Sequence, residues 1–353
     1  MTRDDLSQKL ARGEILQRLD LSGLDLSGLD FGGVIAQELS FRGANLSGAR
    51  LKEATLSTCD LTGANLEGAN LHHITLHKCS LAGANLSGST LTAAKIFETI
   101  LSRADLRGTT SPLLMVHDSS FDEANLSGAR LDRWMVAKTS FSGTNLAGAQ
   151  LVQLAITEAD LSSAKLEGVS FDKVVLHQGS LAGQSLRGLD LRMSQLMDAD
   201  LRGVDFRESN LEKVNMKGSQ LEGARFDKAR AKNAIFVEAT ISKASFRAAV
   251  LEQALFAQAQ VLECAFDGAN LELSMWQKAS AVGCSFRDCK MPYADFSHAD
   301  VTGSDFSGAG LYRVRFHKTK DDGATFGGAR MVALGNDEEL AKAEDWKSRH
   351  AGA

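Results

Sequence analysis

The sequence predicts an all-β solenoid, in which the chain winds into stacked coils and turns a corner at every fifth residue. Three observations support this prediction: an apolar register with a period of five, small residues two positions before it, and self-similarity at roughly 20 residues. A helix has a period of 3.6 and a half-buried strand a period of two, so neither explains the spacing.

The apolar register runs from Leu21 to Met331 in steps of five without a shift of phase. Within it, only Ser111 and Asp321 are not apolar. The chain has 17 phenylalanines, and all except Phe97 lie in the register, so we expect aromatic side chains to form core. The expected core ladder contains Leu46, Leu66, Leu86, Phe206, Phe226, Phe246, Phe266, Phe286, Phe306 and Phe326.

Small residues precede the register by two positions, as at Ala44 and Ala64. We expect both positions to point inward and the intervening polar residues to point outward, so that each group of five residues supplies one wall. Walls one to four begin with the register residues Leu21, Leu26, Phe31 and Ala36. Four walls make a coil of roughly 20 residues, and about 15 to 16 coils are expected.

The repeated runs ANLSGA from Ala44, ANLEGA from Ala64 and ANLSGS from Ala84 carry a family resemblance. They resemble the pentapeptide-repeat proteins, whose motif is A(D/N)LxG, and the resemblance covers roughly residues 21 to 334. It implies a right-handed, quadrilateral parallel β-helix. We therefore expect an N-terminal helical cap at 1–19, the β-helix at 20–334, and a C-terminal helical cap and tail at 335–353.

Both ends of the chain carry helix signals. Thr2 and Asp5 form a potential capping box, and Gly13 can end the helix. Asn336 can cap a second helix, expected from about Asp337 to Arg349. The apolar residues expected to cover the two ends of the solenoid are Leu6 and Leu10 in the first helix, and Leu340, Ala343 and Trp346 in the second.

Glycine is unevenly distributed over the corners. It commonly follows walls one and two, whereas after walls three and four it occurs only at Gly33 and Gly218. Because glycine readily adopts positive φ, we predict tight corners without side chains after walls one and two. After walls three and four we predict corners of a different shape that carry larger side chains.

Composition restricts the function classes. The net charge of -5 comes from mixed charges, so no direct nucleic-acid binding is expected. No secretory segment and no apolar run long enough for a membrane span is visible, which favours the cytoplasm, although export by a signal-independent route stays open. All five cysteines occupy inward positions, and we expect buried, reduced thiols at Cys59, Cys79, Cys264, Cys284 and Cys289.

No pattern in the sequence indicates catalysis. We find no phosphate-binding glycine loop and no nucleophile constellation, and we expect neither catalytic residues nor a cofactor. His72, His73 and His77 superficially resemble a metal cluster, but the coil geometry places them on different outward positions. We therefore predict no metal site.

Apolar residues at outward positions around wall four are the candidate site. Such a stripe favours docking of a different protein, while self-association as a homodimer and local burial at tilted corners remain alternatives. Ser111 and Pro112 interrupt the pattern nearby and suggest a corner or a distorted coil. The candidate docking stripe contains Phe97, Leu113, Met115, Trp134, Met135, Val152, Val175, Ile235, Leu255 and Met275, with Trp134 included because it is too large for its inward slot.

Three functions compete at this stage. The first is a non-enzymatic scaffold or adaptor that binds a protein of unknown identity. The resemblance implies two others: a DNA mimic that interacts with a type II topoisomerase such as gyrase, and a bacterial secretion effector or secretion-system accessory protein. The mixed charge disfavours the DNA mimic, because Arg107, Arg187 and Arg207 share one outward column.

Overall fold

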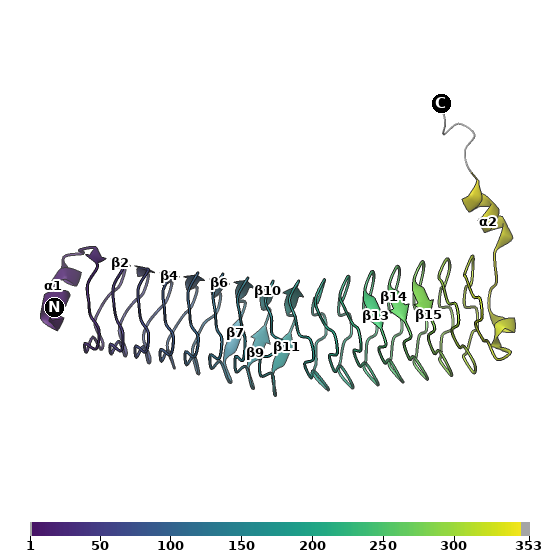
Figure 1. The fold of residues 1–353 in the computed structure, drawn as a ribbon, viewed down its shortest axis with the longest axis horizontal. Helices are drawn as coiled ribbons and strands as arrows, with labels where there is room; N and C mark the ends of the chain where they lie inside the picture. The colour runs from purple at the N-terminus through teal and green to yellow at the C-terminus, as the bar shows by residue number, and fades with distance from the viewer. Residues whose placement is uncertain (1, 347–353) are drawn as a thin grey trace, which may run out of the picture. The chain divides into compact units, whose positions relative to one another are not determined.

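The computed structural model describes residues 2–346 and contains two compact units, Met1–Leu181 and Ala182–Ala353. Within each unit the chain winds as a parallel β-solenoid whose coils follow one another in sequence order (Figure 1). Strands pair in parallel with a constant offset, so that Ile35 lies beside Thr55, which lies beside Thr75. The predicted four-sided parallel solenoid with a short helix at each end of the chain is confirmed.

Among residues 2–346, the first unit contains one helix and two parallel sheets, and the second contains one sheet and two short helices. Helix α1 spans Arg3–Ala11. The nine-stranded sheet on wall four comprises β1 (Leu16–Gln17), β2 (Ile35–Gln37), β3 (Thr55–Ser57), β4 (Thr75–His77), β5 (Lys95–Phe97), β6 (Met115–His117), β8 (Met135–Ala137), β10 (Ala155–Thr157) and β12 (Val175–His177). The sheet on wall three comprises β7 (Arg130–Asp132), β9 (Gln150–Val152) and β11 (Ser170–Asp172). In the second unit, β13 (Thr240–Ser242), β14 (Gln260–Leu262) and β15 (Ser280–Val282) form a sheet on wall one, followed by the 3-10 helix η1 (Ala329–Val332) and helix α2 (Glu338–Asp345).

The Asp or Asn before the register residue explains the repeat motif. Its side-chain oxygen accepts the N–H of the residue two positions on, as Asn45 does from Ser47 at 3.2 Å. This short-range bond closes the turn that starts each wall. In the first unit the spare amide N–H groups also donate from coil to coil, for example from Asn65 to the side-chain oxygen of Asn45 at 3.3 Å. The motif thus fixes both the corner and the stacking of coils.

Corners on all walls pass through the left-handed region, whether or not they carry glycine. Gly48 has φ 62°, and Glu53 in the next corner has φ 61°. The predicted difference between corners is therefore wrong for wall three, where the N–H of Ala54 donates to the carbonyl of Leu51 as in a glycine corner. It holds for wall four of the first unit, where a strand runs directly into the corner, as at Thr58 after β3.

The interior of the first unit is filled by the predicted leucine ladder. Leu46, Leu66 and Leu86 are completely buried. Apolar burial of this kind contributes about 25 cal/mol for each Å² removed from water, which makes the ladder the main source of stability.

Two aromatic ladders fill the interior of the second unit. On wall two, successive rings from Phe206 to Phe326 lie nearly parallel, with centroids 4.5 Å apart between Phe226 and Phe246. The wall-four ladder meets them edge to face, for example where Phe236 contacts Phe246 at 5.8 Å and 90°. Stacked contacts along each ladder and edge contacts between them are the two favoured geometries for aromatic pairs.

Helix α1 covers the first coil as predicted. The capping box between Thr2 and Asp5 is present, and Leu6 is completely buried. Arg3 adds a contact that the sequence did not suggest. Its guanidinium donates to the carbonyl oxygens of Asp25 at 3.2 Å and Ser27 at 2.7 Å, which face no preceding coil.

The C-terminal end differs from the prediction. Helix α2 begins after Asp337, whose side chain rather than that of Asn336 caps it, and it ends at Asp345; Arg349 lies outside the described residues. Leu340, Ala343 and Trp346 are all exposed, so α2 does not cover the last coil with its apolar residues. Arg330 performs this role instead, with its guanidinium carbon 4.2 Å from the ring centroid of Phe316.

All five cysteines are buried free thiols, as predicted. Burial raises the pKa of Cys289 to about 12, and its thiol donates to the carbonyl oxygen of Phe266 at 2.9 Å. Buried thiols held protonated in this way behave as small apolar residues. Within residues 2–346, no helix has the length and apolar character needed to cross a bilayer.

Candidate protein-binding surface

The outward face of the nine-stranded sheet carries the most exposed part of the predicted stripe. Met115 and Met135 are direct neighbours on β6 and β8, and their exposed fractions are 36% and 49%. Leu113, in the corner that leads into β6, is also exposed. No described element of the first unit lies over these strands (Figure 1). These three side chains, together with the half-buried Phe97 and Val175 of the same sheet and Val152 of the wall-three sheet, are called the Met115 strip below.

The strip is a local feature of the sheet. At the same outward position the three preceding strands carry Thr55, Thr75 and Lys95, and the earlier strand β2 carries the exposed Ile35. Because neighbouring strands carry polar residues there, the repeat does not require an apolar residue at this position.

The stripe residues of the second unit differ in their exposure to solvent. Ile235 and Leu255 are half-buried, whereas Met275 is exposed. Local burial therefore accounts for part of the predicted stripe, as one of the alternatives proposed.

Trp134 does not belong to the surface, and its inclusion in the stripe was wrong. Its side chain is completely buried, and its indole N–H donates to the backbone carbonyl of Ser111 at 2.6 Å. Ser111 is a small residue at a register position, and the hydrogen bond places the indole directly beside it. The Trp134 side chain is larger than the usual residue at this inward position, and it also contacts the preceding coil.

Pro112 lies in a corner, which is one of the two outcomes suggested by the sequence, and the coil around it is not distorted. Its carbonyl accepts from Ala93 at 2.8 Å, and Leu113 donates to Asp132 at 2.9 Å, so the pairing continues on both sides. The proline occupies the position whose N–H elsewhere binds an Asp or Asn side chain, as in Ser47, rather than another coil. A proline there removes no bond between coils, and its fixed φ suits the second residue of a turn.

A second exposed cluster lies in the second unit and was missed by sequence reasoning. A depression of about 340 Å³, called the Tyr293 depression below, is lined by Leu273, Met275, Tyr293, Asp295, Arg313, Arg315 and Leu334. Leu273, Tyr293 and Arg313 occupy one corner position in successive coils, with positive φ at each. Reading this outward column down the sequence would have revealed an apolar residue, an aromatic residue and an arginine in succession.

A third cluster connects α2 to the coils. Glu344 accepts from His298 and His317, each at 3.3 Å, and its carboxylate lies 3.2 Å from the Lys318 ammonium. Burial acts to raise the pKa of Glu344, but the bonds from Lys318, His317 and His298 outweigh it and lower the pKa.

The two histidines and Glu344 are close enough to share a metal ion, since their ligand atoms lie within 4.8 Å of one another. The hydrogen bonds do not suit one. Nδ1 of the buried His317 accepts the N–H of Asp337 at 3.1 Å, which leaves the ring proton on Nε2, the atom that would face the metal. The neighbouring Lys318 ammonium would also repel a cation. The cluster is better explained as a set of hydrogen bonds that holds α2 to the coils.

The histidines named from sequence lie apart from this cluster. The rings of His72 and His73 contact each other with centroids 4.3 Å apart, and His77 pairs with Glu98 at 3.2 Å.

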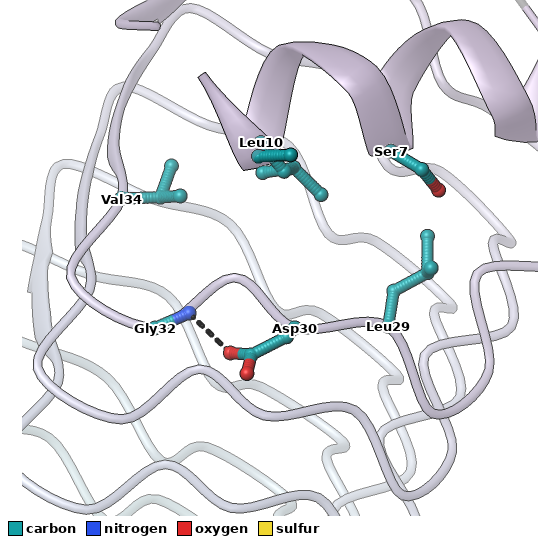
Figure 2. Close-up of a pocket in the computed structure, with 7 residues that line it drawn as sticks. Ser7, Leu10, Leu29, Asp30, Gly32 and Val34 are labelled. Carbon is teal, nitrogen blue, oxygen red and sulfur yellow. Dashed lines mark hydrogen bonds between the residues drawn. The ribbon is translucent and has the colours of Figure 1, made fainter. Parts of the chain in front are cut away.

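A depression of about 410 Å³ separates α1 from the first coil. Figure 2 shows Leu10 of α1 facing Leu29 and Val34 across it. The one carboxylate in view, that of Asp30, accepts the N–H of Gly32 at 2.9 Å and lies 3.6 Å from Arg50. The depression arises because a short helix covers only part of a coil end, and the Ser7 hydroxyl that also lines it already donates to the carbonyl of Arg3 at 3.0 Å.

Arginines accompany many of the aspartates on the outer surface. The pKa of Asp105 is lowered by the hydrogen bond from Arg107, and that of Asp205 by the hydrogen bond from Arg207. The closest contacts in both pairs are 2.6 Å. Such pairing leaves these carboxylates little uncompensated negative charge.

The fold defines a repeat solenoid whose apolar register lies inside and whose outward side chains vary from coil to coil. The family profile for pentapeptide repeats matches the chain in eight copies, at residues 15–52, 40–77, 76–110, 137–178, 164–203, 194–230, 234–272 and 277–308. These matches cover well over half of the sequence. The chain therefore belongs to the pentapeptide-repeat family, as the A(D/N)LxG motif predicted.

Solved structures with related folds include other pentapeptide-repeat proteins. HetL, which is involved in heterocyst differentiation regulation in the cyanobacterium Nostoc sp. strain PCC 7120, is 20% identical, with 80% of this chain and 96% of that one covered and a TM-score of 0.31. QnrB1, a plasmid-mediated fluoroquinolone resistance protein, is 18% identical, with 60% and 91% covered and a TM-score of 0.36. Rfr23 from the cyanobacterium Cyanothece 51142 is 21% identical, with 49% and 97% covered and a TM-score of 0.15. No curated protein sequence matches the chain.

Proposed function

We propose that this chain is a non-enzymatic scaffold that binds another protein through the Met115 strip. The observation that carries the proposal is the pair of exposed methionines, Met115 and Met135, on adjacent strands of an uncovered sheet. The free, buried thiols are consistent with action in the cytoplasm.

The strip has the character of a docking surface. Methionine is flexible and polarizable, and it adapts to the shape of an apolar partner. Contiguous exposed apolar residues on a soluble protein mark interaction sites more often than single ones do. The strands beneath are fixed by ladder bonds, for example between the N–H of Met135 and the carbonyl of Leu114 at 2.9 Å, so the surface is already organised before a partner arrives.

The partner that fits is a protein with an apolar patch, and a second copy of this chain is the alternative. Mimicry of duplex DNA receives no support from this surface, because the strip carries apolar rather than acidic side chains. A role as a secretion effector or accessory has no separate structural feature in its favour.

The test compares the intact chain with Met115→Asp plus Met135→Asp. The matched control is Thr55→Asp plus Thr75→Asp, which adds the same charges at the same outward position of the same sheet. We expect affinity capture followed by reconstitution with the purified partner to show binding to the intact chain and to the control, and loss of binding to the methionine variant. Unfolding curves of all three proteins establish that the fold is kept.

Three results would contradict the proposal. Equal binding by the methionine variant would remove the strip from the interface. A dimer in analytical ultracentrifugation that the methionine substitutions dissociate would replace a different protein by a second copy. Inhibition of gyrase supercoiling by the intact chain and by the methionine variant alike would favour the topoisomerase alternative.

A further inference from the structure

The Tyr293 depression combines an apolar floor with exposed aromatic side chains. Leu273, Met275 and Leu334 are all exposed to solvent there. Tyr293 and the adjacent Tyr312 have exposed fractions of 45% and 54%, and their rings meet edge to face with centroids 5.6 Å apart. The whole chain contains only two tyrosines, so both lie at this one place.

The position of Tyr293 is unusual for its side chain. It stands at a corner with φ 61°, a position that Gln253 occupies two coils earlier with φ 57°. A polar residue in such a corner interacts with water, whereas the Tyr293 ring rests beside other apolar groups that are themselves exposed. Nothing in the solenoid core requires an aromatic residue at this corner.

The charges offered to solvent at the depression are positive. The Asp295 carboxylate is mostly buried and already accepts from Ser297 N at 2.9 Å and from Gln277 Nε2 at 2.8 Å. Arg315 is exposed. Its nearest guanidinium nitrogen lies 3.9 Å from the Asp295 carboxylate, so the ion pair between them is weak. Arg313 is exposed and forms no ion pair with any residue from 2 to 346.

We propose that the Tyr293 depression binds a peptide segment in which a carboxylate-bearing residue stands next to an apolar or aromatic one. The apolar side chain would cover Leu273, Met275 and Leu334 and contact the tyrosine rings. The carboxylate would accept from Arg313 and Arg315, whose planar guanidinium groups suit bidentate binding. Tyrosine and arginine are the residue types that dominate binding energy at protein interfaces.

Single-stranded nucleic acid is the competing ligand, because tyrosines can stack on bases and arginines can bind phosphates. The depression favours a peptide. Its two rings lie perpendicular to each other and offer no parallel platform for successive bases. Nucleic-acid binding also depends on many phosphate contacts, whereas this site has two arginines, one of them already weakly paired with Asp295, on a chain with a net charge of -5.

The experiment selects a random phage-displayed peptide library on the full chain and measures binding of the enriched peptides by fluorescence anisotropy. We expect the enriched sequences to share Asp or Glu beside Leu, Phe or Trp. Arg313→Glu should weaken binding by about tenfold or more, and Arg313→Lys should weaken it less. Tyr293→Gln, which places the residue type of Gln253 in the same corner, should keep the fold and lose a similar amount of affinity.

Met115→Asp plus Met135→Asp should leave the affinity of these peptides unchanged, which separates this site from the Met115 strip. The proposal is overturned if no peptide is enriched, if the enriched peptides lack carboxylates, or if their binding is insensitive to Arg313→Glu. It is also overturned if a labelled oligothymidylate binds more tightly than the peptides and loses affinity on the same substitutions.

Discussion

The indole N–H of Trp134 donates to the backbone carbonyl of Ser111 at 2.6 Å, across two neighbouring coils. Ser111 is one of the two polar residues in the apolar register, and Trp134 is the largest side chain in any of the small inward slots. The Trp134 ring also lies 6.1 Å from that of Phe121. The two exceptions to the repeat are therefore in direct contact, and a large inward residue lies beside a small register residue, as close packing of the interior would favour.

Trp134→Ala is expected to destabilise the first unit by about 3–5 kcal/mol, because it removes a completely buried ring. Ser111→Leu should cost about 1–3 kcal/mol by overpacking against the indole. The double substitution returns both positions to the usual residues of the repeat, so its cost should be clearly smaller than the sum of the two. Urea unfolding followed by circular dichroism measures all three variants.

Ser111→Ala provides the control for this cycle. The Ser111 hydroxyl is buried and has no hydrogen-bond partner among the described residues, so its removal should be neutral or slightly stabilising. Strictly additive costs in the double variant would show that the two residues do not share one space.

The interior of the solenoid could be predicted from sequence because its rule is local. The burial of Leu46 and of Phe246 follows from position in the register alone, without knowledge of neighbouring coils. The exchange between Ser111 and Trp134 could not be predicted in this way, since it joins residues in different coils. Each appeared as a separate anomaly, and the large side chain was taken for a surface residue.

The ends and the outer surface were harder to predict. Because of Leu340 and Trp346, α2 was expected to cover the last coil with apolar side chains. Both residues are exposed, and hydrogen bonds to Glu344 hold the helix instead. Arg330, which covers the last rings, lies in the 3-10 helix η1, which the sequence did not predict. The Tyr293 depression depends on columns of residues separated by whole coils, and only Met275 of its lining was identified.

Arg3→Ala should loosen the first coil without affecting later ones. In the next coil, the carbonyls of Asn45 and Ser47 accept from Leu26 and Gly28, so Arg3 supplies to the first coil the donors that a preceding coil would give. Loss of two partly exposed, charge-assisted bonds should cost about 1–2 kcal/mol locally.

Hydrogen exchange resolved by residue is the measurement for the Arg3 variant. The amides of residues 21–34 should lose protection, while those near Leu86 serve as an internal reference. Arg3→Lys, which keeps the charge but not the fork of donors, should give an intermediate effect. Unchanged protection in Arg3→Ala would show that helix α1 is held by Leu6 alone.

Arg330 should stabilise the last coil through its contact with the exposed ends of the aromatic ladders. Its guanidinium carbon lies 4.2 Å and 4.5 Å from the centroids of Phe316 and Phe326, and Asp321 holds it at 3.1 Å. Arg330→Ala should cost about 1–2 kcal/mol, because it removes both the cation–π contact and the apolar cover of the stem. Arg330→Met keeps the cover and should cost less; equal losses, measured by hydrogen exchange in residues 306–326, would exclude a contribution from the charge.

Acid should weaken the second unit through its paired aspartates. The hydrogen bond from Arg207 lowers the pKa of Asp205 below its ordinary value of 3.8, and Arg202 does the same for Asp200. A pKa that is lower in the folded state stabilises the fold above the unfolded value, and this stabilisation is lost as the pH falls through the folded value. The urea midpoint should therefore stay nearly constant between about pH 7 and pH 5 and decline below about pH 4.

Asp205→Asn tests the origin of this decline. The amide oxygen of asparagine can still accept the backbone N–H of Arg207, which lies 3.1 Å from the Asp205 carboxylate, so the turn is kept while the charge is removed. We expect a lower urea midpoint at neutral pH, because the ion pair is lost. The midpoint should also decline less steeply in acid, because the variant has one carboxylate fewer that binds a proton on unfolding. If the variant and the intact chain decline in parallel below pH 4, the ion pair between Asp205 and Arg207 contributes nothing to acid sensitivity.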